Sequence, residues 1–141
     1  MHMKFKHFIP IQIRINDIDI MGHVNNAAHQ EYFDYGRMRY FEDVLHQEIL
    51  GTEFPIIIAH IEVDYDLPVF INDDIEARTR IIRIGKKSIT FEQQMFDSVK
   101  QVVKSTGKTV MVAYDYKKGV SIPVPDDWKI LIRYYEENDD L

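Results

Sequence analysis

Apolar and polar residues alternate along much of this chain, and the alternation marks five stretches that are typical of half-buried strands. The first runs from Phe5 to Ile15, where isoleucines occupy every second position from Ile9 onward. The other four lie at residues 57–66, 75–81, 89–96 and 108–116. Short polar turns at 72–74, 85–87 and 105–107 separate the later stretches, and turns of this kind favour antiparallel hairpins.

A helical period replaces the alternation between Asn26 and about Gln47. Apolar side chains fall on one stripe of this predicted helix, formed by Phe33, Tyr40, Phe41, Val44 and Leu45. Either Asn25 or Asn26 can cap its start, because an asparagine side chain accepts a hydrogen bond from a first-turn N–H. Gly36 costs about 1 kcal/mol relative to alanine in the middle of a helix. We therefore expect another backbone, most simply a sheet, to approach the helix there, and Gly51 to mark the end of this region.

A second helical pattern follows Pro125. Asp126 can cap it, and its apolar positions are Trp128, Leu131, Ile132 and Tyr135. One strand, a long helix, four strands and a short C-terminal helix predict an α+β fold, in which a five-stranded antiparallel sheet packs on the long helix. The chain shows no linker or repeat, so we expect a single domain over residues 1–141. Since one helix covers one face, the other face and the sheet edges need protection, and we expect self-association.

Composition narrows the function classes. The 141 residues are 45% hydrophobic and 28% charged, as in ordinary globular proteins. A net charge of −6 argues against a nucleic-acid partner, and the absence of cysteine excludes disulfides and thiolate chemistry. The N-terminal residues show no signal-peptide pattern, and no apolar run approaches the roughly 20 residues that span a bilayer. We therefore expect a cytoplasmic protein without a membrane partner.

The most informative stretch is the loop from Asp17 to Asn26, which places two carboxylates, an imidazole and two amides around Gly22. It leads directly into the long helix, and a helix start offers free backbone N–H groups and a partial positive charge. A carboxylate beside these donors can activate a water or attack a carbonyl itself, while the donors hold the developing oxyanion. The residues therefore predict a site for acyl transfer that uses no cysteine or metal cluster.

This loop and the helix after it resemble the 4-hydroxybenzoyl-CoA thioesterase family of hotdog-fold acyl thioesterases. The resemblance rests on Asp17-x-Asp19-x-x-Gly22-His23-Val24-Asn25-Asn26 and Tyr32-Phe33-Asp34-Tyr35-Gly36-Arg37, with later matches at residues 62–68, 72–74, 84–91 and 122–125. It covers roughly residues 5–132. It implies a hotdog fold, in which an antiparallel sheet wraps around a long helix, and assembly into homodimers or homotetramers. It also implies a thioester substrate of coenzyme A or of acyl carrier protein.

The resemblance further implies roles for individual residues. Asp19 corresponds to the family's catalytic carboxylate, and the backbone N–H near Asn26 polarises the thioester carbonyl. The basic turn before the fourth strand contacts the nucleotide phosphates in the family, which points to Lys86, Lys87 and Ser88, with Arg83 nearby. Some branches have a histidine at the position of Asn26, and many have a tyrosine at that of His29. The family implies no cofactor.

Several of these residues also have a plainer interpretation. Asp19 can cap the loop, and Asn25 and Asn26 can act as helix caps, which an oxyanion site requires in any case. Asp17 is expected to bond loop amides and, with Gly22, to support the loop. His23 is either a proton carrier or a packed, backbone-bonded imidazole, and we keep it among the candidate site residues.

The basic pair Lys86 and Lys87 can equally form a solvated hairpin tip. The alternation of His60 with Glu62 and Asp64 fits an exposed strand face, so we predict no metal. The predicted function is hydrolysis of an acyl-CoA to a carboxylic acid and CoA. The alternatives are a thioesterase that acts on acyl carrier protein, a hotdog hydratase or dehydratase, and a non-catalytic acyl-CoA-binding module.

Overall fold

The computed structural model describes residues 4–48 and 55–141, so Gly51 lies outside the described residues. In chain order the elements are β1 (His7–Pro10), a 3-10 turn (Ile15–Asp17), α1 (Asn26–Leu45), β2 (Ile56–Tyr65), β3 (Ile75–Ile84), β4 (Ser88–Asp97), β5 (Val102–Asp115), β6 (Val120–Ser121) and α2 (Asp126–Glu136). The sheet is antiparallel with the order β1-β3-β4-β5-β2, and the two-residue β6 pairs with β5. Within the described ranges, no helix is long and apolar enough to cross a membrane.

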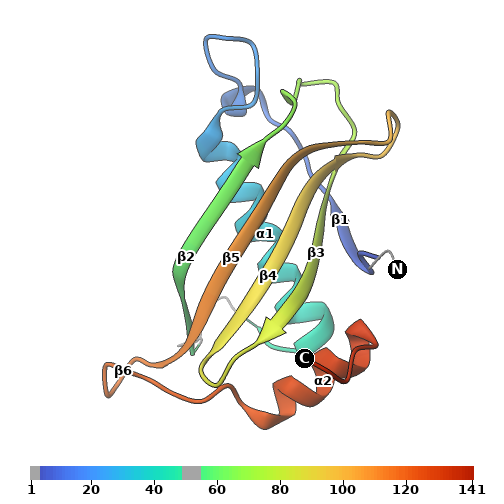
Figure 1. Cartoon of the computed structure of the whole chain (residues 1–141). Coiled ribbons are helices and arrows are strands. Elements are labelled where there is room, and N and C mark those ends of the chain that lie inside the picture. Colours follow the sequence, from blue (N-terminus) through green and yellow to red (C-terminus); the bar gives the residue numbers. More distant parts are fainter. Residues whose placement is uncertain (1–3, 49–54) are drawn as a thin grey trace.

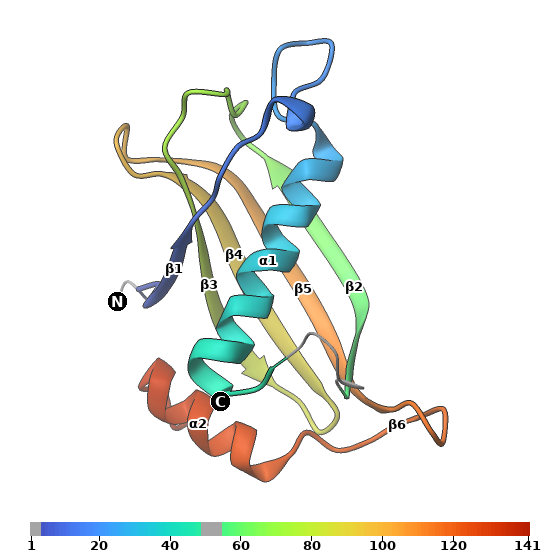
Figure 2. The same ribbon diagram turned by 180° about the vertical axis from the view of Figure 1, so that it is seen from behind.

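The long helix α1 runs along one face of the sheet, as opposite views show (Figures 1 and 2), and α2 lies at the end of the sheet where β3 turns into β4. The 20 residues of α1 make a helix about 30 Å long, and the ten-residue strands are about as long, so the helix spans the sheet. The expected hotdog fold is therefore confirmed, with β6 as an addition to the five expected strands.

The apolar stripe predicted for the long helix is buried, and the core beneath it forms two clusters. One cluster lies toward α2 and contains Tyr40, Phe41, Val44 and Leu45 of α1 with residues of β2–β5 and α2. The other lies toward the start of the helix and contains Ala28, Tyr32 and Phe33 with residues of β1, β3 and β4. The two clusters divide α1 into a half that meets α2 and a half that meets the Asp17–Asn26 loop.

A layer of buried polar side chains separates the two clusters. The Gln93 amide donates from Nε2 to the Phe33 carbonyl oxygen (3.0 Å) and to Thr79 Oγ1 (2.9 Å). The Arg37 guanidinium, 2% exposed, donates to Gln93 Oε1 (2.9 Å) and to Thr109 Oγ1 (3.2 Å). These bonds join the middle of α1 to three strands of the sheet.

Gly36 lies directly over this polar layer. A Cβ at this position would come within 2.8 Å of Gln93 Nε2 and 3.1 Å of Thr79 Oγ1. The close approach expected at Gly36 therefore exists, but sheet side chains make it rather than sheet backbone. Gly36 thus allows the helix to lie close enough for the Gln93 amide to reach a helix carbonyl.

The first strand is shorter than the pattern predicts. β1 ends at Pro10, and the Ile11 N–H makes a last bond to the Ile75 carbonyl oxygen (2.9 Å). The chain then leaves the sheet, and Ile15 is 79% exposed. The alternation continues past the strand because Ile11 and Ile13 still pack against the core, although the register of β1 with β3 ends at Pro10.

The turn predicted at residues 105–107 is also wrong. These residues lie within β5, where they pair with β2 and β4, and the turn between β4 and β5 lies at residues 98–101. Asp97 organises that turn, because its Oδ1 accepts from the N–H groups of Val99 (3.0 Å) and Lys100 (2.9 Å). Gly107 occurs inside the strand because a Cβ there would come within 3.3 Å of the Phe33 ring.

Asp126 is the first residue of α2 rather than its cap. Pro125 occupies the N-cap position, and no side chain there bonds the first turn. The Asp126 carboxylate is exposed and lies 3.7 Å from Lys129 Nζ. Its contribution to the helix is therefore its negative charge at the positive end of the dipole.

We expect Gly36→Ala to lower the free energy of unfolding by about 1–3 kcal/mol, although alanine is the better helix former. The added methyl group would displace the Gln93 amide, which three hydrogen bonds hold in place. Urea unfolding measures the change, with Glu31→Ala on the exposed side of the same helix as the control. Unchanged or higher stability of Gly36→Ala would contradict the role assigned to this contact.

Candidate functional site

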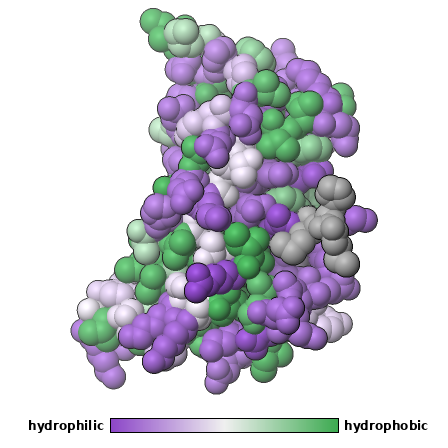
Figure 3. All heavy atoms as spheres, viewed as in Figure 1, coloured by the Kyte–Doolittle hydropathy of each residue, from purple (hydrophilic) through white to green (hydrophobic). Residues whose placement is uncertain are grey.

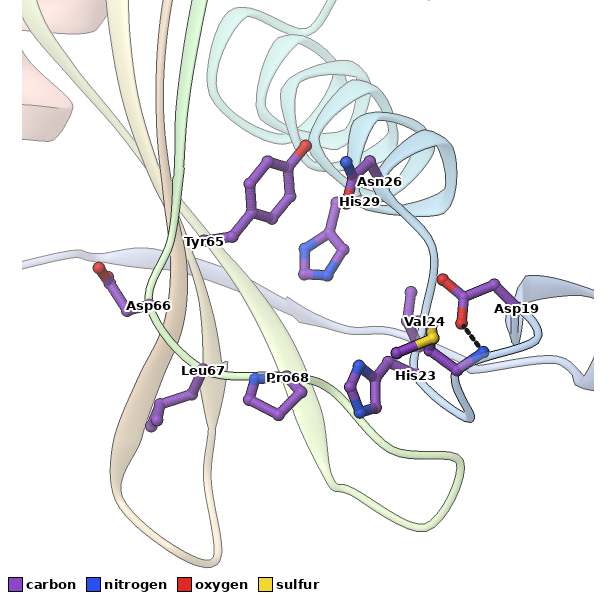
Figure 4. A pocket seen from close by; sticks show the side chains of 10 residues that line it. Asp19, His23, Val24, Asn26, His29, Tyr65, Asp66, Leu67 and Pro68 are labelled. Atoms are coloured by element: carbon purple, nitrogen blue, oxygen red, sulfur yellow. Dashed lines mark hydrogen bonds between the residues drawn. The ribbon is translucent and has the colours of Figure 1, made fainter.

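A cavity of about 280 Å³ lies at the start of α1, between the preceding loop and the end of β2. Its lining residues are Asp19, Met21, His23, Val24, Asn26, His29, Tyr65, Asp66, Leu67 and Pro68. In Figure 4 the loop and the first turn of the helix form one side of the cavity, and the segment after β2 forms the other. Of the predicted site residues, the cavity brings together Asp19, His23 and Asn26.

The Asp19 carboxylate is exposed and is held at one of its oxygens. Its Oδ1 accepts from the Met21 N–H (2.8 Å). Backbone bonds close the loop around it, from Asp19 N–H to the His23 carbonyl oxygen (2.9 Å) and from Gly22 N–H to the Asp19 carbonyl oxygen (3.0 Å). Gly22 has a φ of +82°, which a glycine adopts without a steric penalty. The bonded oxygen fixes the carboxylate, while the other can meet a water or a ligand.

The start of α1 leaves two backbone donors for a ligand. Asn25 is the N-cap, and its side chain accepts from the Ala28 N–H (2.8 Å), while its own N–H donates to the Asp17 carbonyl oxygen (2.9 Å). In the part of the chain that the structure describes, the N–H groups of Asn26 and Ala27 have no acceptor. These two donors stand at the positive end of the helix dipole, where a developing anion is stabilised.

Asp17 lies beneath the loop and is 4% exposed. It accepts from the Tyr32 hydroxyl (2.6 Å) and from the Arg14 backbone N–H (3.0 Å). Burial alone would raise the pKa of Asp17, but these hydrogen bonds and the Arg14 charge outweigh it and hold that pKa below its usual value. Burial and the bond to Asp17 raise the pKa of Tyr32. The ionised carboxylate thus ties the loop to the body of α1.

The wall after β2 depends on a buried ion pair that the sequence analysis did not identify. Lys104, 4% exposed, places its Nζ 3.2 Å from Asp73 Oδ2 and donates to the Pro68 carbonyl oxygen (2.9 Å). Asp73 also accepts from the Phe70 N–H (2.9 Å). The Phe70 ring meets the ring of His23 edge-on, with 5.3 Å between centroids. His23 therefore both lines the cavity and packs against this wall.

His29 was not among the predicted site residues, yet it lines the cavity. It is 3% exposed, its Nδ1 lies 3.0 Å from Ser105 Oγ, and the Tyr65 ring meets it edge-on with 5.0 Å between centroids. Burial lowers the pKa of His29, so the ring is neutral near pH 7. A sequence signal was available, because residues three apart on a helix share a face and His29 follows Asn26 by three.

The predicted phosphate-binding residues lie away from the cavity. Arg83, Lys86, Lys87 and Ser88 surround the β3–β4 turn, at the α2 end of the sheet (Figure 1). The three cations are exposed and take part in no ion pair with a described residue. Lys87 Nζ donates to Ser121 Oγ (3.2 Å). A single protomer does not bring this turn and Asp19 together.

The exposed strand face that carries His60 contains a pair rather than a cluster. His60 Nε2 lies 2.9 Å from Glu62 Oε1. Across residues 4–48 and 55–141, no three histidine, aspartate or glutamate side chains converge in a way that could hold a metal ion.

We expect Asp17→Asn to lower the free energy of unfolding by about 1.5–3 kcal/mol near neutral pH, because it removes the charge that Tyr32 and Arg14 bond. The pKa of Asp17 is lower in the folded chain than its ordinary value of 3.8. Its contribution is therefore complete above that value and is lost as the pH falls through the folded-state pKa. Urea unfolding at a series of pH values should show the two proteins converging below about pH 4. A difference that persists in acid would argue against the charge as its source.

Comparison with known proteins shows that this chain is similar to thioesterases in sequence and in fold. A thioesterase from Thermus thermophilus, in a crystal structure with coenzyme A and zinc, is 27% identical, covers 93% of this chain and 94% of its own, and gives a TM-score of 0.83. A predicted thioesterase from Bacillus stearothermophilus is 27% identical, with coverage of 91% and 94% and a TM-score of 0.82. The acyl-CoA thioesterase YbgC of Haemophilus influenzae is 22% identical over 117 residues, which are 81% of this chain and 86% of that protein.

The model of the Thioesterase-like superfamily matches residues 13–131, from the approach to the Asp17–Asn26 loop to the middle of α2. The match includes α1, all the long strands and every residue that lines the cavity. The chain belongs to the Thioesterase-like superfamily.

Proposed function

We propose that this thioester hydrolase cleaves the thioester of an acyl-CoA, giving a free carboxylic acid and coenzyme A. The observation that carries the proposal is the meeting, at one cavity, of the exposed Asp19 carboxylate and Asn26, whose N–H and that of the next residue, Ala27, are unbonded at the start of α1. Two similar proteins support the choice of substrate. One is an acyl-CoA thioesterase, and the other is a thioesterase with coenzyme A bound.

In the proposed reaction the thioester carbonyl oxygen accepts from the N–H groups of Asn26 and Ala27, which stabilise the oxyanion as it develops. Asp19 can then act by either of two routes. As a base it takes a proton from a water that attacks the carbonyl carbon, and the tetrahedral intermediate collapses to the acid and the CoA thiolate. As a nucleophile it attacks the carbonyl carbon itself and expels the thiolate, and water then opens the mixed anhydride. The bond from Met21 to Oδ1 suits both routes, since it leaves Oδ2 available.

The apolar part of the cavity suits an acyl group. Met21, Val24, Leu67 and Pro68 line it beside the polar residues. The tip of the loop is also apolar, with Ile20 fully exposed and Met21 72% exposed. In Figure 3 apolar atoms gather where this tip projects at the upper left. We infer that the acyl chain lies along these side chains, with its carbonyl turned toward the start of α1.

The position of the basic turn supports a homodimer formed through β2. This ten-residue strand is an edge of the sheet, and Ile58 and Ile61 are exposed on it. An unpaired edge of this length is a template for pairing with another chain. Antiparallel pairing of two copies of β2 turns one protomer end over end relative to the other. The β3–β4 turn of one protomer then lies at the same end as the cavity of its partner, where Lys86 and Lys87 would bind the phosphates of CoA.

We expect Asp19→Asn and Asp19→Ala to reduce kcat by roughly 10²–10⁴-fold, because the base or nucleophile of the proposed reaction is lost. The assay is thiol release from a panel of short, medium, long and aromatic acyl-CoAs. The matched control is Asp66→Asn, which changes the other carboxylate of the cavity lining. Its kcat should fall far less.

Circular dichroism and size-exclusion chromatography should show that the Asp19 variants keep the fold and the oligomer. Near-normal turnover by either variant would refute the role of Asp19. If the wild type releases no thiol from any acyl-CoA, the substrate is wrong, and acyl carrier protein thioesters are the next to test.

For the basic turn, the double variant Lys86→Ala with Lys87→Ala should raise KM for an acyl-CoA roughly 3–10-fold and leave kcat unchanged. The same acyl group on pantetheine, which lacks the nucleotide and its phosphates, should show no change in KM. An equal rise in KM for both substrates would argue against phosphate binding by these lysines.

Mixing subunits tests whether the turn serves the cavity of the partner. A heterodimer of the Asp19→Ala protomer with the Lys86→Ala, Lys87→Ala protomer contains one complete site only if the lysines act across the interface. That site should recover the wild-type KM at about half the wild-type turnover per dimer. About half the wild-type turnover at the raised KM of the lysine variant would instead place the phosphate contact within one protomer.

A further inference from the structure

The reaction described above leaves one buried ionisable group of the cavity without a role. His29 is held by Ser105 through Nδ1 and by the edge of Tyr65, and it is nearly inaccessible to solvent. Apolar contacts alone would not require an imidazole at this place. A buried polar ring that is fixed on one side and faces a cavity on the other is arranged to present its second nitrogen to a ligand.

The hydrogen bond to Ser105 determines which nitrogen carries the hydrogen. Ser105 is fully buried, and within the described residues its hydroxyl has His29 Nδ1 as its partner. A buried hydroxyl that has one acceptor in reach donates its hydrogen there. Nδ1 is then an acceptor, and because the ring is neutral its hydrogen is on Nε2. His29 therefore presents an N–H donor on the side away from the sheet.

The placement of His29 on α1 directs this donor toward the reacting carbonyl. Side chains on a helix tilt toward its N-terminus, so a residue in the second turn reaches over the first. His29 follows Asn26 by three residues and lies on the same face of the helix. In Figure 4 its ring lies in the cavity below Asn26, between Tyr65 and the loop that carries Asp19.

We propose that His29 is a catalytic residue that donates a hydrogen bond from Nε2 to the carbonyl oxygen of the bound thioester. It would join the N–H groups of Asn26 and Ala27 as a third donor and strengthen its bond as negative charge develops on the oxygen. No proton leaves the ring in this role, so the imidazole is neutral before and after the reaction. The inference rests on the proposed function, since it assumes that a thioester carbonyl occupies the cavity.

Nitrogen NMR of protein with ¹⁵N-labelled histidine tests the tautomer whether or not the protein is active. The His29 signals are identified by their loss in His29→Gln. We expect a protonated Nε2 and an unprotonated Nδ1 near pH 7, and a shift of the Nε2–H resonance on addition of 2-oxopropyl-CoA, a ketone that keeps the carbonyl but has no scissile thioester. Hydrogen on Nδ1, or an Nε2–H signal that the bound ketone does not move, would overturn the proposal.

Kinetics then test the contribution to the reaction. His29→Leu should lower kcat roughly 10²-fold with little change in KM, because the lost bond is strongest in the transition state. His29→Gln, whose amide N–H has a similar reach, should recover most of that loss, and unfolding measurements should show both variants folded. Equal losses in the two variants, or no loss in His29→Leu, would overturn the role of His29. An inactive wild type would instead refute the proposed function, and the NMR result would still decide the donor.

Discussion

The position of α1 along the sheet depends on the hydrogen bond from the Gln93 amide to the Phe33 carbonyl oxygen. The apolar clusters on either side of it would lose little if the helix slid by a fraction of a turn, because hydrophobic burial has no direction. A buried amide left without its hydrogen-bond partner costs far more free energy, so the polar layer selects one position of the helix along the sheet. Arg37 adds to this selection, since it reaches Gln93 and Thr109 from within the core. These hydrogen bonds require a glycine at position 36, because a side chain there would keep the helix from lying close enough to the sheet.

A fixed position of α1 along the sheet also fixes the position of its first turn. Buried polar groups join the Asp17–Asn26 loop to the helix. The Asp17 carboxylate accepts a hydrogen bond from the hydroxyl of Tyr32, which lies in α1. The Asp17 carbonyl oxygen accepts from the N–H of the N-cap residue Asn25. On the other side the Val24 N–H donates to the Val69 carbonyl oxygen (2.8 Å), which links the loop to the segment that Lys104 and Asp73 fix. The Asp19 carboxylate is thus exposed on a loop, yet both of its neighbouring segments are held by buried bonds. This is how an exposed group keeps a fixed position relative to the helix donors.

Periodicity predicted the elements well, since it reflects burial that is local in sequence. The stripe from Phe33 to Leu45 and the four later strands follow from spacing alone. The predictions were wrong where an apolar or small residue is required by packing against another element rather than by the secondary structure at its own position. Ile11 and Ile13 pack on the core after their strand has ended, and Gly107 makes room for a ring from the helix.

The polar contacts that hold the site to the sheet could not be predicted from spacing, because they join residues far apart in the chain. Lys104 reads as an ordinary surface lysine until Asp73 is seen beside it, and Ser105 gives no sign that it bonds His29. Gln93 lies on the same strand face as Phe91 and Met95, where spacing alone predicts burial but not that its amide bonds a helix carbonyl. The loop residues were identifiable because the chemistry and the helix cap lie within ten residues of each other.

The two ends of the protomer impose the remaining constraint. Asp19 lies at the loop end of the sheet, whereas Lys86 and Lys87 lie at the α2 end, and strands about 33 Å long separate them. A ligand that is cleaved at one end and held by its phosphates at the other would have to run the whole length of one protomer. The homodimer proposed above would remove that requirement, because antiparallel pairing through the edge strand β2 would invert the second copy. β1 is a poor alternative, since it has four residues where β2 has ten. The proposed homodimer through β2 would therefore account for three features together, namely the unpaired edge, the exposed carboxylate and the distant cations.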